Sequence, residues 1–288
     1  MLDHDRVLEC AMSLPALPPT VYQLLHLVRE PEPDLLEIAR VIELDPVLTL
    51  KVLRLANSAF FSRGKPVGRI KDAVLRLGAG TILGIAVGAA CQALTPRFIP
   101  GYRLRSEEFW HHCVTAGVAA ELGRVYCRQD WSALAFTSAV LHDIGKLVLG
   151  RLMTEEHLAF LDRAQHEGKQ ELWQAERQIL SLDHGDVGGF IATYWNLPDC
   201  IVDGIKYHHH PQDGFDLLSS VTFLADGISH RVCQSDRSHW EEWGDCDALH
   251  YACQALGLDR SGLERWCQAV HNQNVSQGTP VGNGRQRA

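Results

Sequence analysis

The residues best suited to chemistry in this sequence are His142 and Asp143, which stand next to each other within residues 141–146. A neutral imidazole beside a carboxylate is a common pair of metal ligands, and mixed sets of this kind suit zinc, iron or manganese. Further histidines and an aspartate occur at intervals on both sides of the pair: His112, His184, His208, His209 and Asp226. Their types and order predict a metal centre to which several segments contribute.

Local spacing indicates how some of these side chains could meet. Glu108 and His112 are four residues apart, so both lie on one face of a helix. His142 and Asp143 point about 100° apart around a helix, so that one metal lies between them or two metals share them. A carboxylate can bridge two metals, and a two-metal centre suits in-line displacement at phosphorus. Lys146, three residues beyond Asp143, would hold its ammonium near a phosphate bound there.

Histidines also have ordinary structural roles. A single buried histidine usually satisfies a backbone partner rather than binding a metal. Four others are interpreted as surface residues: His111, His157, His166 and His210. A helical scaffold whose histidines pack and hydrogen-bond without a metal therefore stays open as an alternative, although the complete ordered set favours a polar cluster that binds metal.

The composition is that of a soluble globular protein. The 288 residues are 46% hydrophobic and 22% charged, which is enough chain for one large or two ordinary domains. The apolar runs are too short to cross a membrane, and charged residues precede the first one, unlike in a signal peptide. Nine cysteines without a CxxC pair indicate reduced thiols rather than disulfides. We therefore expect a cytoplasmic protein with no membrane contact.

The charge argues against one class of partner. The formal net charge is −8, and the strongest basic cluster, between residues 63 and 76, is loose. An extended nucleic-acid footprint requires clustered lysines and arginines. The basic residues are therefore interpreted as a solvated face.

Nearly every segment has the 3.6-residue periodicity of helices, which predicts an all-α fold. Asp34 and Asp45 are expected N-caps, and Gly78 an expected C-cap. Two prolines and a glycine within residues 95–101 predict a boundary between two helical parts. Helical periodicity returns from 106 to about 231 and from about 240 to 271, whereas the polar, Gly-rich tail 272–288 is expected to be disordered.

Several spaced motifs resemble those of the HDOD family, a group of bacterial signalling modules whose name means HD-related output domain. In the first half these are LPALP at 14–18, DPVL at 45–48, LANSAF at 55–60 and AVLRLG at 73–78. In the second half they are FWHH at 109–112, LHDIGK at 141–146, WNLP at 195–198, YHH at 207–209 and LAD at 224–226. The resemblance covers roughly residues 10–231.

This resemblance implies an N-terminal helical subdomain, residues 1–97, packed on an HD-like helical core, residues 101–231, with a helical extension at 232–271. The nearest catalytic relatives are the HD-GYP phosphodiesterases, which hydrolyse cyclic di-GMP at a centre of two or three metals. Their pattern implies a binuclear iron, manganese or zinc site with Lys146 contacting phosphate. The implied ligands are Glu108, His112, His142, Asp143, His184, His208, His209 and Asp226.

The sequence departs from HD-GYP proteins directly after His209. The Gly-Tyr-Pro element is missing, and the chain continues as HPQDG at 210–214. The family resemblance and this departure favour a signalling output module that binds partner proteins or a ligand and retains the metal site. The alternative is a phosphohydrolase of a nucleotide or cyclic dinucleotide, in which Asp143 and Lys146 would be catalytic. We expect weak or no hydrolysis of cyclic di-GMP.

Overall fold

The computed structural model describes residues 4–58, 60–62, 64–166, 170–234 and 246–276. Its described part is almost wholly helical, and its one sheet pairs the two-residue strands β1 (Phe98–Ile99) and β2 (Leu104–Arg105) in antiparallel register. The all-α fold expected from the periodicity is confirmed.

The first set of helices consists of α1 (His4–Met12), α2 (Pro19–Val28), α3 (Leu35–Glu43), α4 (Pro46–Ala56), α5 (Ile70–Leu77) and α6 (Ala79–Leu94). Three of them have an end that the sequence predicts: the starts of α3 and α4 and the end of α5. The carboxylates of Asp34 and Asp45 each accept two backbone N–H groups at the starts of α3 and α4. Gly78 ends α5 with φ of 80°, a value that favours glycine. These caps fix where the helices begin and end.

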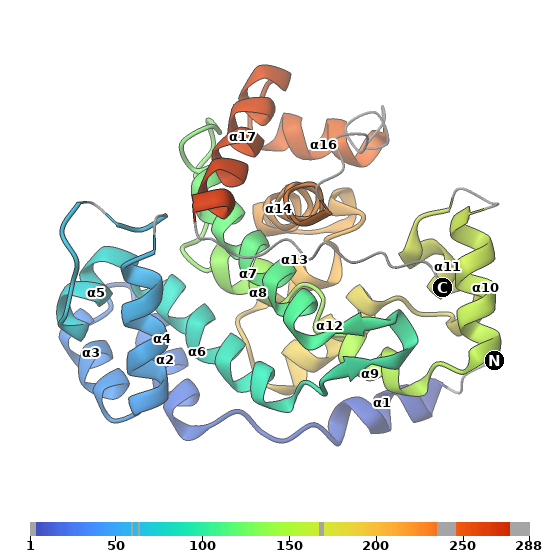
Figure 1. The fold of residues 1–288 in the computed structure, drawn as a ribbon, viewed down its shortest axis with the longest axis horizontal. Coiled ribbons are helices and arrows are strands. Elements are labelled where there is room, and N and C mark those ends of the chain that lie inside the picture. The colour runs from blue at the N-terminus through green and yellow to red at the C-terminus, as the bar shows by residue number, and fades with distance from the viewer. Residues whose placement is uncertain (1–3, 59, 63, 167–169, 235–245, 277–288) are drawn as a thin grey trace.

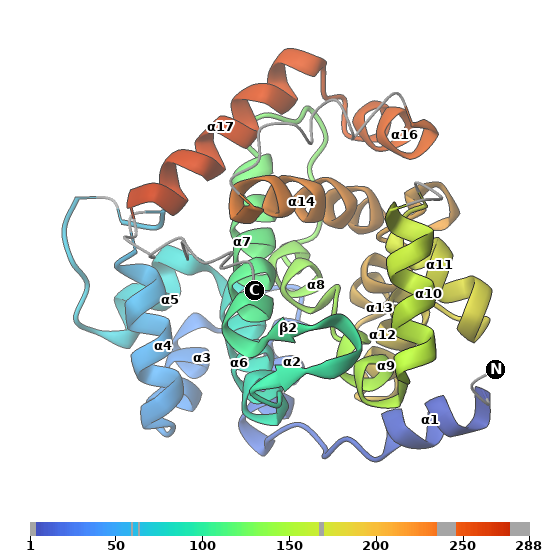
Figure 2. The ribbon, with the colours of Figure 1, turned by 45° about the vertical axis from the view of Figure 1, so that its right-hand side comes forward.

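A hairpin with the short helix η1 (Pro100–Tyr102) leads into the second set of helices. That set consists of α7 (Ser106–Gly123), α8 (Ala135–Leu141), α9 (Lys146–Leu152), α10 (Glu155–His166), α11 (Leu172–Leu180), α12 (His184–Tyr194), α13 (Asp199–Lys206), η2 (Pro211–Asp213), α14 (Leu217–Gln234), α16 (Asp247–Ala255) and α17 (Arg260–Ser276). Figure 2 shows α14 lying across α7 and α8. The helix α17 continues to Ser276, so the expectation of disorder is wrong for 272–276, and 277–288 lie outside the described residues.

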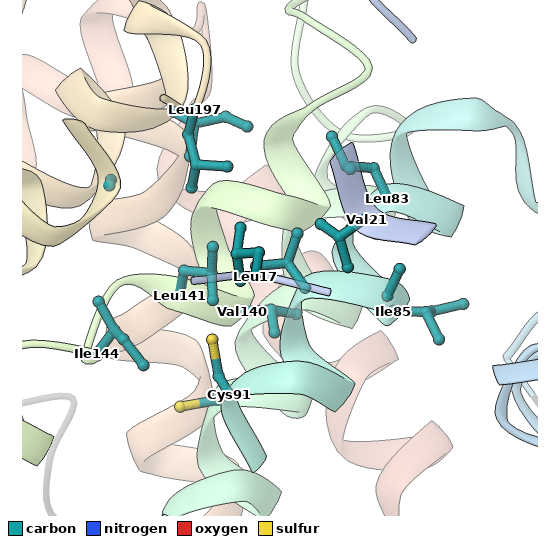
Figure 3. Packing of buried hydrophobic residues seen from close by; sticks show 14 of the residues in the cluster. Leu17, Val21, Leu83, Ile85, Cys91, Val140, Leu141, Ile144 and Leu197 are labelled. Carbon is teal, nitrogen blue, oxygen red and sulfur yellow. The ribbon is translucent and has the colours of Figure 1, made fainter. Parts of the chain in front are cut away.

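One hydrophobic core joins helices from both sides of the hairpin. Figure 3 shows Leu17 and Val21 close to Leu83 of α6 and to Val140 and Leu141 of α8. The helix α1 packs on α9 and α12 of the second set (Figure 1), where it buries Val7 and Ala11. The segment before the hairpin is therefore not packed as a separate body, and the division at 97–101 stays a prediction.

Close contact between α6 and α8 depends on glycine. A Cβ atom at Gly80 would lie 1.9 Å from the carbonyl oxygen of Ala133, and one at Gly84 would lie 2.5 Å from the ring of Phe136. The small residues let α6 approach α8, which leads directly to His142. The backbone that carries the metal-ligand pair is thereby fixed against the first set of helices.

Among the described residues, no single helix has the length and apolar composition needed to cross a membrane; α5 and α6 meet those criteria only together, with a bend of 108° between them.

Candidate metal centre

Seven of the eight predicted ligands converge inside the second set of helices. They come from α7 (His112), the turn after α8 (His142 and Asp143), the start of α12 (His184), the turn after α13 (His208 and His209) and α14 (Asp226). All are buried except His112 and His209, which are half-buried. The expectation that separate helices would bring these side chains together is met, whereas their role as ligands stays a prediction.

The first group, named here the His112 subsite, consists of His112, His142 and Asp226. The Nε2 atoms of the two imidazoles are 3.1 Å apart. They lie 3.0 and 3.3 Å from the same oxygen, Oδ1 of Asp226. Three candidate ligand atoms thus surround one point in space.

The second group, named here the His184 subsite, consists of His184, His208 and His209. The Nε2 atoms of His184 and His209 are 2.8 Å apart. Ligands about 2.0–2.1 Å from one ion, at roughly right angles, are separated by about 3 Å. The N–N distances in both subsites therefore fit pairs of ligands to a common ion.

Asp143 lies between the two subsites. Its Oδ1 is 3.2 Å from Nε2 of His184, and its Oδ2 is 3.5 Å from Nε2 of His142. Lys146 donates to Oδ2 at 2.7 Å, whereas its predicted contact with phosphate stays a prediction. The two oxygens of one carboxylate thus face different subsites, which is the arrangement of a bridging ligand.

The outer nitrogens of the imidazoles fix their orientation. In four of the rings Nδ1 lies 2.6–2.7 Å from an oxygen: His112 from Oγ of Ser229, His142 from O of Ala139, His184 from Oε2 of Glu176, and His208 from O of Ile205. Such outer partners hold the N–H on Nδ1 and leave the Nε2 lone pair for a metal. The four rings are therefore oriented as ligands.

Three buried atoms confirm that the centre suits a cation. Among the described residues, Oδ1 of Asp143, Oδ1 of Asp226 and Nε2 of His208 have no hydrogen-bond partner. A neutral imidazole that carries its proton on Nδ1 cannot donate from Nε2, so the short contacts to Asp226 bring lone pairs together. Buried polar atoms without partners are costly. A divalent ion at each subsite would satisfy these atoms, so the residues present fit such ions.

The charges of the cluster favour the metal-binding forms of Asp143 and His208. Burial raises the pKa of a carboxyl group, but Lys146 and His142 hold the pKa of Asp143 well below its usual range. Burial, together with the charges of His142 and His184, lowers the pKa of His208 to about 3. Asp143 is therefore ionised and His208 neutral at physiological pH.

Glu176 is a supporting residue that sequence analysis missed. It is fully buried, and its Oε2 accepts from N and Nδ1 of His184 while Oε1 accepts from the hydroxyl of Tyr102. Burial lowers the pKa of His184, but Glu176 and Asp143 together raise it to about 10. The metal-free ring is therefore protonated at physiological pH, and it releases the proton on Nε2 when a metal binds there. The sequence contains one signal: Glu176 falls on the same face of α11 as Leu172 and Leu180, which is the apolar face.

Glu108 does not join the cluster, contrary to expectation. Its carboxylate accepts from the backbone N and the guanidinium of Arg105, both at 3.1 Å, and its side chain is 49% exposed. Glu108 is in the first turn of α7, where free backbone N–H groups attract a carboxylate. The capping interaction directs it toward Arg105 although its spacing places it on the face of His112.

The other histidines have varied positions. His157 is half-buried in the first turn of α10, where its Nδ1 accepts from N of Thr154. His210 is half-buried and stacks on Trp173, and the side chain of His166 lies outside the described residues. His230 was not among the candidates, yet its Nε2 lies 3.4 Å from Oδ1 of Asp226. It is the one histidine that the structure adds to the cluster.

The HDOD domain family matches residues 14–211, well over half of the chain. The chain belongs to the HDOD family. This confirms the resemblance drawn from the motifs, and the matched range ends two residues after the predicted ligand His209.

Solved structures of similar proteins share this fold. A protein of Shewanella amazonensis SB2B, provisionally assigned as a phosphohydrolase, superposes with a TM-score of 0.71 at 25% identity, over 96% of this chain and 98% of that one. A protein of Marinobacter aquaeolei VT8, provisionally assigned to signal transduction, gives a TM-score of 0.66 at 22% identity, over 92% of this chain and 58% of that one. An uncharacterized protein of Treponema pallidum (strain Nichols) is 26% identical over 219 residues, which are 73% of this chain and 41% of that protein. The chain spans less than half the length of this curated relative.

Proposed function

We propose that this chain is a signalling output module whose helical core binds two divalent metal ions, one at the His112 subsite and one at the His184 subsite, with Asp143 between them. One observation carries the metal centre: four imidazoles have Nδ1 facing an oxygen and Nε2 directed inward, where buried carboxylate oxygens have no hydrogen-bond partner. Iron, manganese and zinc suit this set of nitrogen and oxygen ligands.

The burial of the centre supports a regulatory role over turnover. His142, Asp143, His184 and His208 are at most 2% exposed. The cavity beside Lys146 measures about 240 Å³, below the roughly 300–1,000 Å³ of ordinary ligand pockets. Together with the missing Gly-Tyr-Pro element, this favours a module in which metal stabilises the conformation that signalling partners bind. The partners and the cytoplasmic location stay predictions.

A phosphohydrolase acting on a nucleotide or cyclic dinucleotide is the second candidate, because of Lys146. Its buried ammonium lies against Asp143 and forms part of the wall of the cavity, which Arg103 also lines. Two cations could there bind a phosphate ester, with Lys146 stabilising charge on it. Paired metal ions would supply Lewis-acid chemistry toward that ester.

Metal analysis of the purified chain tests the proposal. We expect about two ions per chain after supply of iron, manganese or zinc, and a loss of bound metal in His142→Asn. His26→Asn, at an exposed position of α2, is the matched control and should retain both ions. A wild-type chain that binds no metal under any supply would contradict the proposal.

A hydrolysis assay separates the two candidates. We expect no appreciable turnover of nucleotides or cyclic dinucleotides with manganese or iron present. Robust turnover that is lost in Asp143→Asn, and that persists in His26→Asn, would favour the phosphohydrolase.

A further inference from the structure

We propose that His230 is an additional, exchangeable protein ligand of the metal ion in the His112 subsite, an inference that rests on the proposed metal centre. His230 lies on α14, one turn after Asp226. Its Nε2 is 3.4 Å from Oδ1 of Asp226, the same oxygen that faces His112 and His142. Three imidazole nitrogens thus lie 3.0, 3.3 and 3.4 Å from one carboxylate oxygen.

The spacing along α14 explains how His230 reaches this position. Residues three and four apart on a helix share a face, so Asp226, Ser229 and His230 all face the His112 subsite. Asp226 supplies an oxygen, Ser229 holds Nδ1 of His112 at 2.7 Å, and the ring of His230 lies 4.3 Å from the ring of His112 between centroids. One helical turn therefore contributes three groups to the same site.

His230 would fill a coordination position that the other ligands leave open. His112, His142, Asp226 and one oxygen of the bridging Asp143 supply four ligands, and a six-coordinate ion such as manganese has two positions beyond these. The carboxylate of Glu108 binds Arg105 instead, whereas Nε2 of His230 lies against Asp226. Coordination by His230 would fill one of the two open positions.

Exposure makes this ligand exchangeable. The side chain of His230 is 47% exposed, compared with 12% for His112 and Asp226 and 0% for His142. Outer contacts at Nδ1 hold the rings of His112 and His142, and Asp226 is mostly buried, while an exposed ring can change rotamer on a short timescale. An oxygen ligand arriving from solvent would therefore displace His230 before any other ligand of the subsite.

Two variants separate ligation from packing. His230→Phe keeps a ring over His112 but has no nitrogen, and His230→Ala removes the ring and leaves space for imidazole from solution. Each full-length variant, with wild type and the control His26→Phe, is loaded with cobalt(II). Visible absorption reports the coordination of cobalt, chelator competition reports affinity, and circular dichroism verifies folding.

We expect both His230 variants to bind one of the two ions about 10–100-fold more weakly and to show altered cobalt absorption. Added imidazole should restore the wild-type spectrum in His230→Ala but not in His230→Phe. If wild type binds two ions and His230→Phe matches it in affinity and spectrum, the role of His230 is refuted while the metal centre stands. If wild type itself binds no cobalt, the proposed metal centre fails and this inference fails with it.

Discussion

Removal of the Glu176 carboxylate tests how far the metal centre depends on groups outside its ligand set. Glu176 is fully buried and accepts three hydrogen bonds, from N and Nδ1 of His184 at 2.9 and 2.7 Å and from the Tyr102 hydroxyl at 2.8 Å. Glu176→Ala leaves these three buried donors without their acceptor.

Each buried donor without a partner costs about 1–3 kcal/mol, and water that enters the space left by the side chain offsets part of the sum. We therefore expect Glu176→Ala to lower the free energy of unfolding by about 3–5 kcal/mol. Tyr102→Phe removes only one of the three hydrogen bonds and should cost about 0.5–1.5 kcal/mol. Glu176→Gln keeps an oxygen for His184, so its main effect should be on metal affinity, which we expect to fall about 10–100-fold.

Urea unfolding followed by circular dichroism, in excess chelator, measures these differences without a contribution from bound metal. Chelator competition then measures metal affinity. Glu43→Ala, at an exposed acidic position of α3, is the control and should change stability by less than about 0.5 kcal/mol. If Glu176→Ala unfolds at the same urea concentration as wild type, the three hydrogen bonds do not stabilise the centre as argued here.

Two further predictions concern the helices that hold the centre. A Cβ atom at Gly145 would lie 2.0 Å from the carbonyl oxygen of His184, so Gly145→Ala should cost about 3 kcal/mol and reduce bound metal. Gly68→Ala is the control, because a Cβ there meets nothing within 4 Å, and it should leave the melting temperature and metal content unchanged. Equal losses in Gly145→Ala and Gly68→Ala would contradict the close approach of Gly145 to His184. Burial raises the pKa of Glu121 despite its contact with Arg124, so the folded state holds the proton more tightly than the unfolded state. The stability from this group is therefore present below pH about 4.5 and is lost as pH rises through the folded pKa. In Glu121→Gln, the free energy of unfolding from urea titrations should fall less between pH 4 and 7 than in wild type. An unchanged fall would contradict the raised pKa of Glu121.

The sequence predicted the parts of the fold that depend on neighbouring residues. Asp34 and Asp45 cap the helices they precede, and Gly78 separates α5 from α6, because caps depend on side chains within three residues. The hairpin lies at the predicted boundary near residue 97, but the division into two parts stays a prediction. That α1 packs on α9 and α12 could not be predicted, because periodicity identifies an apolar face and not its partner.

In the candidate site, too, some positions follow from the sequence and others depend on how the helices pack. The order of histidines and aspartates predicted seven residues that converge, because family motifs fix which positions face the core. Glu108 was misplaced because local capping by Arg105 outweighs its spacing to His112. Glu176 was missed because it contacts His184 from another segment, so only the packing of helices reveals the contact. His230 stands four residues after Asp226 on α14, but its contact with His112 also depends on the packing of helices.

The position of α1 has a consequence for synthesis of the chain. Val7 and Ala11 of α1 are buried where α1 packs on α9 and α12, and α12 begins at residue 184. At about 5–20 residues per second, the ribosome needs roughly 10–30 s to make the chain between them. The helix α1 therefore waits with its apolar face exposed until much of the chain has been made. In cells, α1 should be a chaperone-binding segment of the nascent chain, and its docking should be among the last steps that complete the core.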